Sequence, residues 1–259
     1  MNTVEEEDFD YIILGASTGL TTLNTKAIDS VLETSGINLA MDDTGIASHY
    51  LMLQHFLNQG KTSKYCVLVP NAISYDMNYS NVSDNDYRFL PFVNEDYVNT
   101  YYDAYDGFES NVMSVSDYVP FVGVSYYNAE LFFPSLLTAV NAQKRNRFDE
   151  RGNYTYPERN VKSVPISSKT DILIQFKNTD LVAIWNLCKA NDIELICYVA
   201  PMQDTSIKTK VQKFQVINHS DLLDNTKYFY DTIHVNEKGR QLTSLEFAAD
   251  IKAIFDSNN

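Results

Sequence analysis

Three residues whose side chains can cooperate in acyl chemistry lie at the two ends of this chain. The segment YDTIHVNEKG, residues 230–239, places Asp231 and His234 three positions apart, directly before a helix-like tail. Ser17 follows the short apolar run DYIILGA, residues 10–16. A serine hydroxyl attacks an ester carbonyl when a base takes its proton, and a carboxylate that fixes the tautomer of an imidazole supports that base. These residue types match a Ser-His-Asp triad, provided that the fold brings them together.

Each of the three residues also has an ordinary structural interpretation. A serine between a strand and a helix can cap the helix or form a turn, so Ser17 alone is weak evidence for catalysis. Asp231 can cap a turn, and His234 can be a polar surface residue. The elements that would position the three residues decide between these interpretations.

Apolar runs and helical spacing alternate at both ends of the chain. The spacing predicts, in order, a strand at 10–16, a helix at 25–36 stopped by Gly36, a strand at 37–40, a helix at 46–60 and a strand at 64–70. After a long interruption it predicts a helix at 178–192, a strand at 193–201, extended pieces at 213–218 and 227–231, and a closing amphipathic helix at 237–255. Such alternation favours an α/β fold with a parallel sheet and helices on both faces.

The segment from residue 72 to 168 breaks this pattern. It holds twelve of the eighteen tyrosines, and one helix with an internal proline is expected in it, at 129–145. Nearly a hundred residues are too many for an ordinary loop, so we interpret the segment as an insertion or cap over the ligand edge of the sheet. The alternative is that its aromatic residues form a small core of their own.

Polar residues follow three of the predicted strands. In an open parallel sheet, ligands bind beyond the carboxyl ends of the strands. The loops expected there are GAST at 15–18, MDDTG at 41–45 and PNAIS at 70–74. Ser17 is therefore expected at the mouth of the site.

Composition excludes several classes of partner. The 34 acidic and 20 basic side chains give a formal charge of −14, which repels nucleic acid and anionic membrane surfaces. We expect no membrane span and no export signal in the chain as given, because no apolar run is long enough and the N-terminus is acidic. The three cysteines lie in apolar runs without metal-like spacing, which indicates reduced core thiols.

The remaining candidate sites are weaker. His49 and His55 lie six positions apart, a spacing that does not place both on one metal-binding face of a helix, so surface or packing roles are expected. His219 stands in a polar turn with no partner suggested by the sequence. GASTG lacks the spacing of a phosphate-binding loop. No metal and no organic cofactor is expected.

Taken together, ILGASTG, PNAIS and D-T-I-H before the last helix resemble the sequence blocks of the SGNH hydrolases, the GDSL-like esterase family. The resemblance implies that Ser17 is the nucleophile, that His234 is the base and that Asp231 orients it. It also implies an oxyanion hole formed by the backbone N–H of Ser17, the side chain of Asn71 and a residue of the second block. That last position is normally glycine, and here it is occupied by Asp42 or, with a shift of one residue, by Asp43.

The resemblance covers residues 10–71 and 178–255 and implies one domain, with a three-layer α/β/α flavodoxin-like core and the inserted Tyr-rich cap at 72–168. It implies a serine esterase or O-acyltransferase acting on acyl esters, acetyl esters above all, of carbohydrate or of an acylated small molecule. The ending Y-x-D-x-x-H-x-N-x-x-G is similar to the branch that handles cell-surface polysaccharides, which includes the D-alanine transfer protein and exopolysaccharide acetyl esterases and transferases. That branch implies a location in the cell envelope. The alternative is an impaired module that binds a glycan or an assembly partner, because an acidic side chain at the glycine position disfavours an oxyanion.

Overall fold

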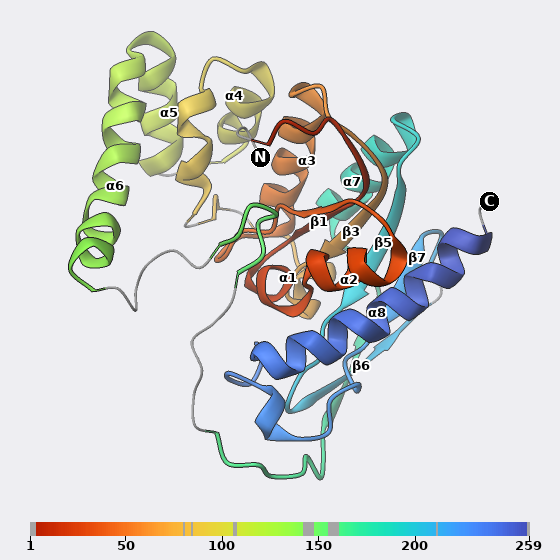
Figure 1. Cartoon of the computed structure of the whole chain (residues 1–259). Helices are drawn as coiled ribbons and strands as arrows, with labels where there is room; N and C mark the ends of the chain where they lie inside the picture. Colours follow the sequence, from red (N-terminus) through yellow and green to blue (C-terminus); the bar gives the residue numbers. More distant parts are fainter. Residues whose placement is uncertain are drawn as a thin grey trace. The chain divides into compact units, whose positions relative to one another are not determined.

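Five parallel strands form the central sheet of the protein (Figure 1). The computed structural model describes residues 4–79, 81–83, 85–105, 108–141, 148–154, 161–210 and 212–257. The strand order is β2-β1-β3-β5-β7, and the strands span β1 (Asp8–Gly15), β2 (Gly36–Asn38), β3 (Thr62–Val69), β5 (Glu194–Val199) and β7 (Gln215–Asn218). Because all neighbouring pairs are parallel, the loops at their carboxyl ends share one edge of the sheet.

Helices cover both faces of this sheet. One face packs against α3 (Ile46–Asn58) and α7 (Thr179–Ala190), and the other against α2 (Thr25–Leu32) and α8 (Glu237–Ser257). Successive side chains of a strand point to opposite faces, so Ile12 joins the first apolar cluster and Ile13 the second. Each is fully buried, which stabilises the fold by about 1.5–3 kcal/mol per side chain. The predicted three-layer α/β/α architecture with a parallel sheet is confirmed.

The predicted elements of the sheet and its helices are confirmed to within a few residues. Helix α2 ends earlier than expected, since Glu33 adopts a left-handed conformation with φ 58° and stops the helix. Gly36 begins β2 instead of ending the helix. A Cβ on Gly36 would lie 2.1 Å from the ring of Tyr11, so glycine is required there by the close approach of this ring.

The extended piece expected at 227–231 is present only at Phe229, which is extended and forms an antiparallel bridge with Val235. Residues Thr226–Tyr228 form the short 3-10 helix η4 instead. The side chain of Asn225 accepts a hydrogen bond from the backbone N–H of Lys227 and so begins this turn, which overrides the β propensity of Tyr228.

A second, two-stranded sheet was not predicted. In it, β4 (Thr170–Ile174) pairs in parallel with β6 (Thr205–Thr209). Ile174 and Ile207 from these strands join the first apolar cluster of the core. The short 3-10 helix η1 (Ala72–Tyr75) follows β3 and packs there as well.

The chain divides into two compact units, Met1–Asn78 with Phe148–Asn259, and Tyr79–Arg147. Residues 72–78 and 148–168 of the expected cap therefore belong with the sheet. The second unit contains η2 (Asp86–Phe92), α4 (Asp96–Asp103), α5 (Phe108–Tyr118) and α6 (Pro120–Val140). Helix α6 contains much of the helix expected at 129–145, of which residues 142–145 lie outside the described residues.

Aromatic residues of the second unit form a small interior of their own. The hydroxyl of Tyr101 donates to the Asp86 carboxylate at 2.5 Å, and the hydroxyl of Tyr102 donates to the backbone carbonyl of the same residue at 2.5 Å. Both tyrosines are buried, and their rings meet edge to face with centroids 5.3 Å apart. The separate aromatic core that the sequence left as an alternative is thus present. A role of this unit as a cap over the ligand edge stays a prediction.

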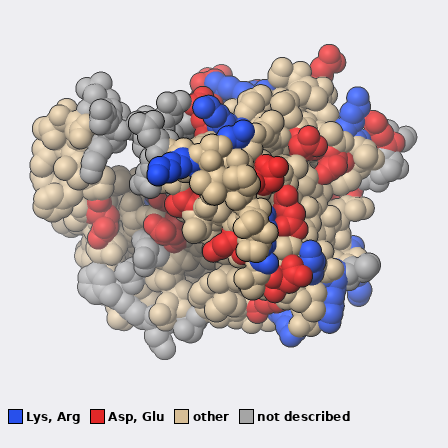
Figure 2. Space-filling view, turned by 90° about the horizontal axis from the view of Figure 1, so that it is seen from below, with Lys and Arg blue, Asp and Glu red and all other residues tan. Residues whose placement is uncertain are grey.

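Charged groups of both signs are interspersed over the face shown in Figure 2, where they do not gather into one basic stripe among the coloured residues. Within the described ranges, none of the helices combines the length and the apolar character that crossing a bilayer requires.

Candidate active site

Ser17, His234 and Asp231 form a continuous hydrogen-bonded chain. The Oγ atom of Ser17 lies 2.8 Å from Nε2 of His234. The Nδ1 atom of the same ring lies 3.0 Å and 2.9 Å from the two carboxylate oxygens of Asp231. Both contacts fall within the range expected for a nucleophile, its base and the residue that orients the base. The structure thus brings together the three residues that the sequence singled out.

The Asp231 carboxylate determines which nitrogen of His234 carries the proton. Burial raises the pKa of Asp231, but hydrogen bonds from the His234 ring and from the backbone N–H groups of Ile233 and His234 outweigh this effect, so the pKa lies below its ordinary value. An ionised carboxylate only accepts hydrogen bonds, so Nδ1 must donate. In the neutral ring, Nε2 then carries the lone pair that accepts a hydrogen bond from the Ser17 hydroxyl.

The loop that carries His234 is held from both ends. The side-chain oxygen of Asn236 accepts hydrogen bonds from the backbone N–H groups of Lys238 and Gly239, which caps the N-terminus of α8. The side-chain amide of Asn236 donates to the carbonyl of Lys227 at 2.7 Å. A Cβ on Gly239 would lie 2.2 Å from the carbonyl oxygen of Tyr228, so the helix approaches the preceding turn as closely as glycine allows.

Ser17 is held by contacts between the ends of β1 and β3. It is the first residue of the short helix α1 (Ser17–Thr22). The N–H of Ala16 and the hydroxyl of Thr18, which flank it, both donate to the carbonyl of Val69, at 3.2 Å and 3.3 Å. A Cβ on Gly15 would lie 2.2 Å from that same oxygen. The small residues of GAST are therefore required for the two strand ends to meet, and this contact fixes the direction of the serine.

Asn71 lies beside the triad at the end of β3. It lines a hollow of about 10 Å³, with room for roughly one water molecule, together with residues next to Ser17 and His234 in the chain, Thr18 and Ile233. The side-chain oxygen of Asn71 accepts a hydrogen bond from the backbone N–H of Ile73 at 3.3 Å. Its amide nitrogen makes no hydrogen bond within the described part of the chain, and neither does the backbone N–H of Ser17. Two donors predicted for an oxyanion hole are thus available.

The loop after β2 lies next to the loop after β1, because the N–H of Met41 donates to the carbonyl of Gly15 at 2.9 Å. Within this loop the left-handed conformation that favours glycine is adopted by Asp43, with φ 50°. Asp42, which the sequence favoured for the glycine position, does not adopt it. Asp43 is exposed at the surface and Asp42 is half-buried.

Sequence reasoning missed the residue that joins these two loops. The side-chain amide of Asn38, buried at the end of β2, donates to the carbonyl of Gly19 in α1 at 3.1 Å. Its side-chain oxygen accepts from the N–H of Ala40 at 3.0 Å. An asparagine inside the apolar run expected as a strand at 37–40 was the available signal, since a buried amide needs hydrogen-bond partners.

The other histidines do not belong to the triad. His49 and His55 are buried in α3, and burial lowers the pKa of His49 to about 3 and that of His55 to about 4. Packing roles, one of the two expectations, therefore apply to both. His219 has partners that the sequence did not reveal, because its ring lies 2.8 Å from the Asp250 carboxylate and 3.1 Å from the Tyr198 hydroxyl.

The cysteines, Cys66, Cys188 and Cys197, are buried and unbridged, as the sequence predicts. A hydrogen bond with Cys188 and burial raise the pKa of Cys66, and burial raises that of Cys197, which favours the neutral thiols. No cluster of three or more side chains suited to hold a metal ion is found among the described residues.

The protein was compared with families and proteins of known function. Neither the comparison with protein-family models nor that with curated proteins finds a match for this chain.

Proposed function

We propose that the protein is a serine esterase or O-acyltransferase that acts on acyl esters of carbohydrate. The observation that carries this proposal is the hydrogen-bonded chain from Ser17 through His234 to Asp231, with distances of 2.8 Å and 2.9 Å across its two contacts. General-base catalysis requires such a contact between the nucleophile and its base.

The reaction follows from the direction of the hydrogen bonds. The Ser17 oxygen attacks the acyl carbonyl carbon while its proton moves to Nε2 of His234. The tetrahedral intermediate then breaks its bond to the sugar oxygen, which leaves as a hydroxyl after taking that proton. Water or a second sugar hydroxyl attacks the acyl-serine and gives its proton to the same nitrogen. The second intermediate then breaks its bond to the Ser17 oxygen, which takes that proton back, and the free acid or the new sugar ester is released. Asp231 stabilises the imidazolium formed in both halves.

Asn71 and the backbone N–H of Ser17 stabilise the negative oxygen of the intermediates. Donors that make no hydrogen bond beforehand need not break one as charge develops, so they serve this purpose well. Both lie at the carboxyl edge of the sheet, next to the attacking hydroxyl.

The carbohydrate class rests on residue chemistry and on the resemblance described above. Aromatic rings pack on the C–H faces of sugars, and the Asn and Asp residues of the Tyr-rich segment suit hydroxyl groups. Cell-surface polysaccharide is the corresponding substrate, and the cell envelope is the corresponding location. Acetyl is the acyl group that the resemblance favours.

A second candidate function is supported by the loop after β2. An acidic residue, Asp42 or Asp43, occupies the position that is glycine in the SGNH blocks, and Asp43 has the left-handed backbone that favours glycine. A negative charge close to an oxyanion would disfavour it. In this alternative the fold is an impaired module that binds a glycan or an envelope-assembly partner.

Turnover of an aryl acetate distinguishes the serine esterase or acyltransferase from the impaired binding module. The first proposal predicts burst kinetics and steady hydrolysis by the wild type, and a loss of at least about 10³-fold in kcat for Ser17→Ala and for His234→Ala. Ser168→Ala, which changes an exposed serine, is the matched control and retains activity. Equal rates for all four proteins would leave only the binding module. If the wild type is active, release of acetate from acetylated polysaccharides then tests the substrate class.

A further inference from the structure

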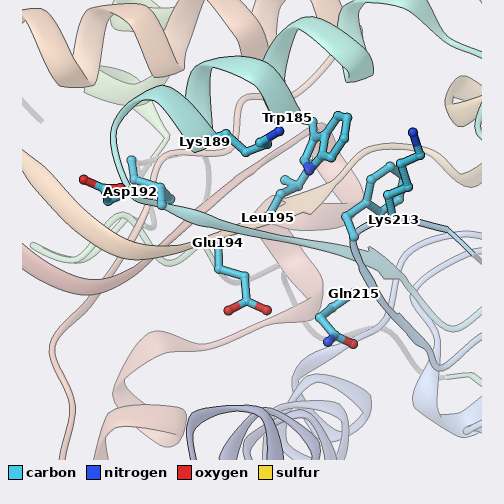
Figure 3. Close-up of a pocket in the computed structure, with 9 residues that line it drawn as sticks. Trp185, Lys189, Asp192, Glu194, Leu195, Lys213 and Gln215 are labelled. Carbon is cyan, nitrogen blue, oxygen red and sulfur yellow. The ribbon is translucent and has the colours of Figure 1, made fainter. Parts of the chain in front are cut away.

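A hollow of about 520 Å³ opens at the end of α7, away from the triad (Figure 3). Its lining combines the only tryptophan of the chain with charged and polar side chains. The residues that matter here are Trp185, Lys189, Asp192, Glu194, Lys213 and Gln215. The volume lies within the range of small-molecule sites in proteins.

This hollow lies at the opposite edge of the sheet from the triad. Glu194 and Gln215 are the first residues of β5 and β7, whereas Ser17 and Asn71 follow the last residues of β1 and β3. The six residues of β5 span about 20 Å, so one small ligand cannot contact both places. The hollow is a site of its own and not a pocket of the catalytic center.

Trp185 offers a fixed aromatic surface. Part of the side chain packs against the apolar cluster that includes Ile184 and Leu195, and it is half-buried. A ring anchored in this way loses little conformational entropy when a ligand packs on it. The exposed part of the only tryptophan of the chain can therefore pack against a ligand at little entropic cost.

Two lysines converge on this ring. The ammonium of Lys189 lies 4.6 Å from the ring centroid and that of Lys213 lies 5.9 Å from it. Neither forms an ion pair with any carboxylate in the part of the chain that the structure describes, although acidic residues outnumber basic ones by 34 to 20. Figure 3 shows Glu194 and Gln215 on the other side of the strand from Trp185. The lining also holds the carboxylates of Asp192 and Glu194, so the positive charge is confined to the two lysines at the ring.

The two ammonium groups are free to move to a ligand. An exposed cation–π contact contributes only about 0.5–1 kcal/mol. A charge-assisted hydrogen bond to an anion is stronger than such a contact. An anion that reaches the ring therefore attracts both lysines from their present positions.

We propose that this hollow binds a sugar residue that carries an anionic group, as a unit of an acidic polysaccharide. The C–H face of the sugar packs on Trp185, and the carboxylate or phosphate of the sugar pairs with Lys189 and Lys213. The choice of a sugar over another anion with a flat apolar face rests on the proposed function. The hollow would then be a second, non-catalytic site. It would hold an acidic polysaccharide on the protein while the triad acts on acyl groups at another position of the same polysaccharide.

The single tryptophan gives a direct readout, because all intrinsic tryptophan fluorescence comes from the site. Tetragalacturonate and glucose 6-phosphate are titrated into the full chain, together with fully methyl-esterified tetragalacturonate, inorganic phosphate and benzoate. The proposal predicts a saturable change with at least one of the two anionic sugars, and whichever binds more tightly identifies the anion. Replacing both lysines, Lys189→Gln with Lys213→Gln, weakens this binding at least tenfold, roughly the effect of losing one charge-assisted hydrogen bond.

Lys177→Gln, at an exposed lysine outside the hollow, is the matched control and binds as the wild type does. The proposal is overturned if neither anionic sugar changes the fluorescence, if the esterified sugar binds as well as the acid, or if phosphate or benzoate has the same effect at the same concentration. Equal binding by the wild type and the double variant also overturns it. Ser17→Ala is titrated in parallel. Because this assay needs no turnover, inactivity toward aryl acetate and failure to bind the sugar are separate results.

Discussion

The hydroxyl of Ser17 lies 2.8 Å from Nε2 of His234, although 217 positions separate the two residues in the chain. This contact exists because β1 ends at Gly15 against β3, and because Asn236 caps α8 directly after the loop that carries the histidine. These two local arrangements, one at each end of the chain, thus bring Ser17 and His234 into contact.

Replacing Asp231 by asparagine tests the role of the carboxylate. The amide keeps the size of the side chain but can donate to Nδ1 of His234, which favours the wrong tautomer. We expect kcat toward an aryl acetate to fall by about 10³–10⁴-fold with little change in KM. Asp224→Asn, at an exposed aspartate in the same region, is the control and keeps its rate. An Asp231→Asn protein as fast as this control contradicts the assigned role.

Two substitutions of Asn71 separate its structural role from its proposed catalytic one. Asn71→Asp keeps the oxygen that accepts from Ile73 but loses the amide donor, and Asn71→Ala loses both. If the amide stabilises the oxyanion, kcat falls by about 10²–10³-fold in both variants, while the thermal midpoint falls clearly only in the alanine variant. Full activity of Asn71→Asp excludes the amide from the oxyanion hole.

The backbone at Asp43 predicts opposite effects for neighbouring glycine substitutions. At Asp43, with φ 50°, glycine removes left-handed strain and raises the free energy of unfolding by about 1 kcal/mol. At Asp42, which lacks a positive φ, glycine adds chain entropy to the unfolded state and lowers that free energy by about 0.5–1 kcal/mol. Urea unfolding of both variants measures the difference, and stabilisation by Asp42→Gly in place of Asp43→Gly contradicts the conformation described.

Buried His49 makes stability depend on pH. Burial lowers its pKa in the folded protein to about 3, against about 6.5 in the unfolded chain. Between these values the unfolded chain binds a proton that the folded chain does not, so the free energy of unfolding falls as the pH falls. At about pH 5 this loss amounts to about 2 kcal/mol.

His49→Gln removes the titrating group and retains a side chain that can reach the hydroxyl of Thr44, which now lies 3.1 Å from Nε2 of the histidine. Chemical unfolding at about pH 7 and about pH 5 should show a smaller decrease in stability for this variant than for the wild type. The same decrease in both proteins contradicts the buried neutral state of His49.

The sequence predicts those strands and helices that a short stretch of residues marks by itself. Continuous apolar runs mark β1 and β3, which are buried on both faces, and Asn178 before an apolar spacing marks the start of α7. The parallel pair of β4 and β6 gave no such signal, because most of β4 is exposed and its partner lies 35 residues away in the paired register.

Contacts between residues distant in sequence also explain the other features that the sequence did not predict. The helices α4 and α5 lie in Tyr- and Asn-rich sequence with poor helical propensity, and packing such as that of Tyr101 and Tyr102 against Asp86 overrides that propensity. At the site, the triad followed from residue types and their order. The roles of Asn38 and the conformation of Asp43 did not, because both depend on how the loops after β1 and β2 meet.

Covalent labelling tests the central claim most directly, namely that Ser17 is a nucleophile activated by His234. The protein is treated with a fluorophosphonate, and the modified residue is located by peptide mass spectrometry. The account predicts one adduct, on Ser17, that forms quickly in the wild type, far more slowly in His234→Ala and not at all in Ser17→Ala. An unlabelled wild type, or equal labelling in all three proteins, would contradict it.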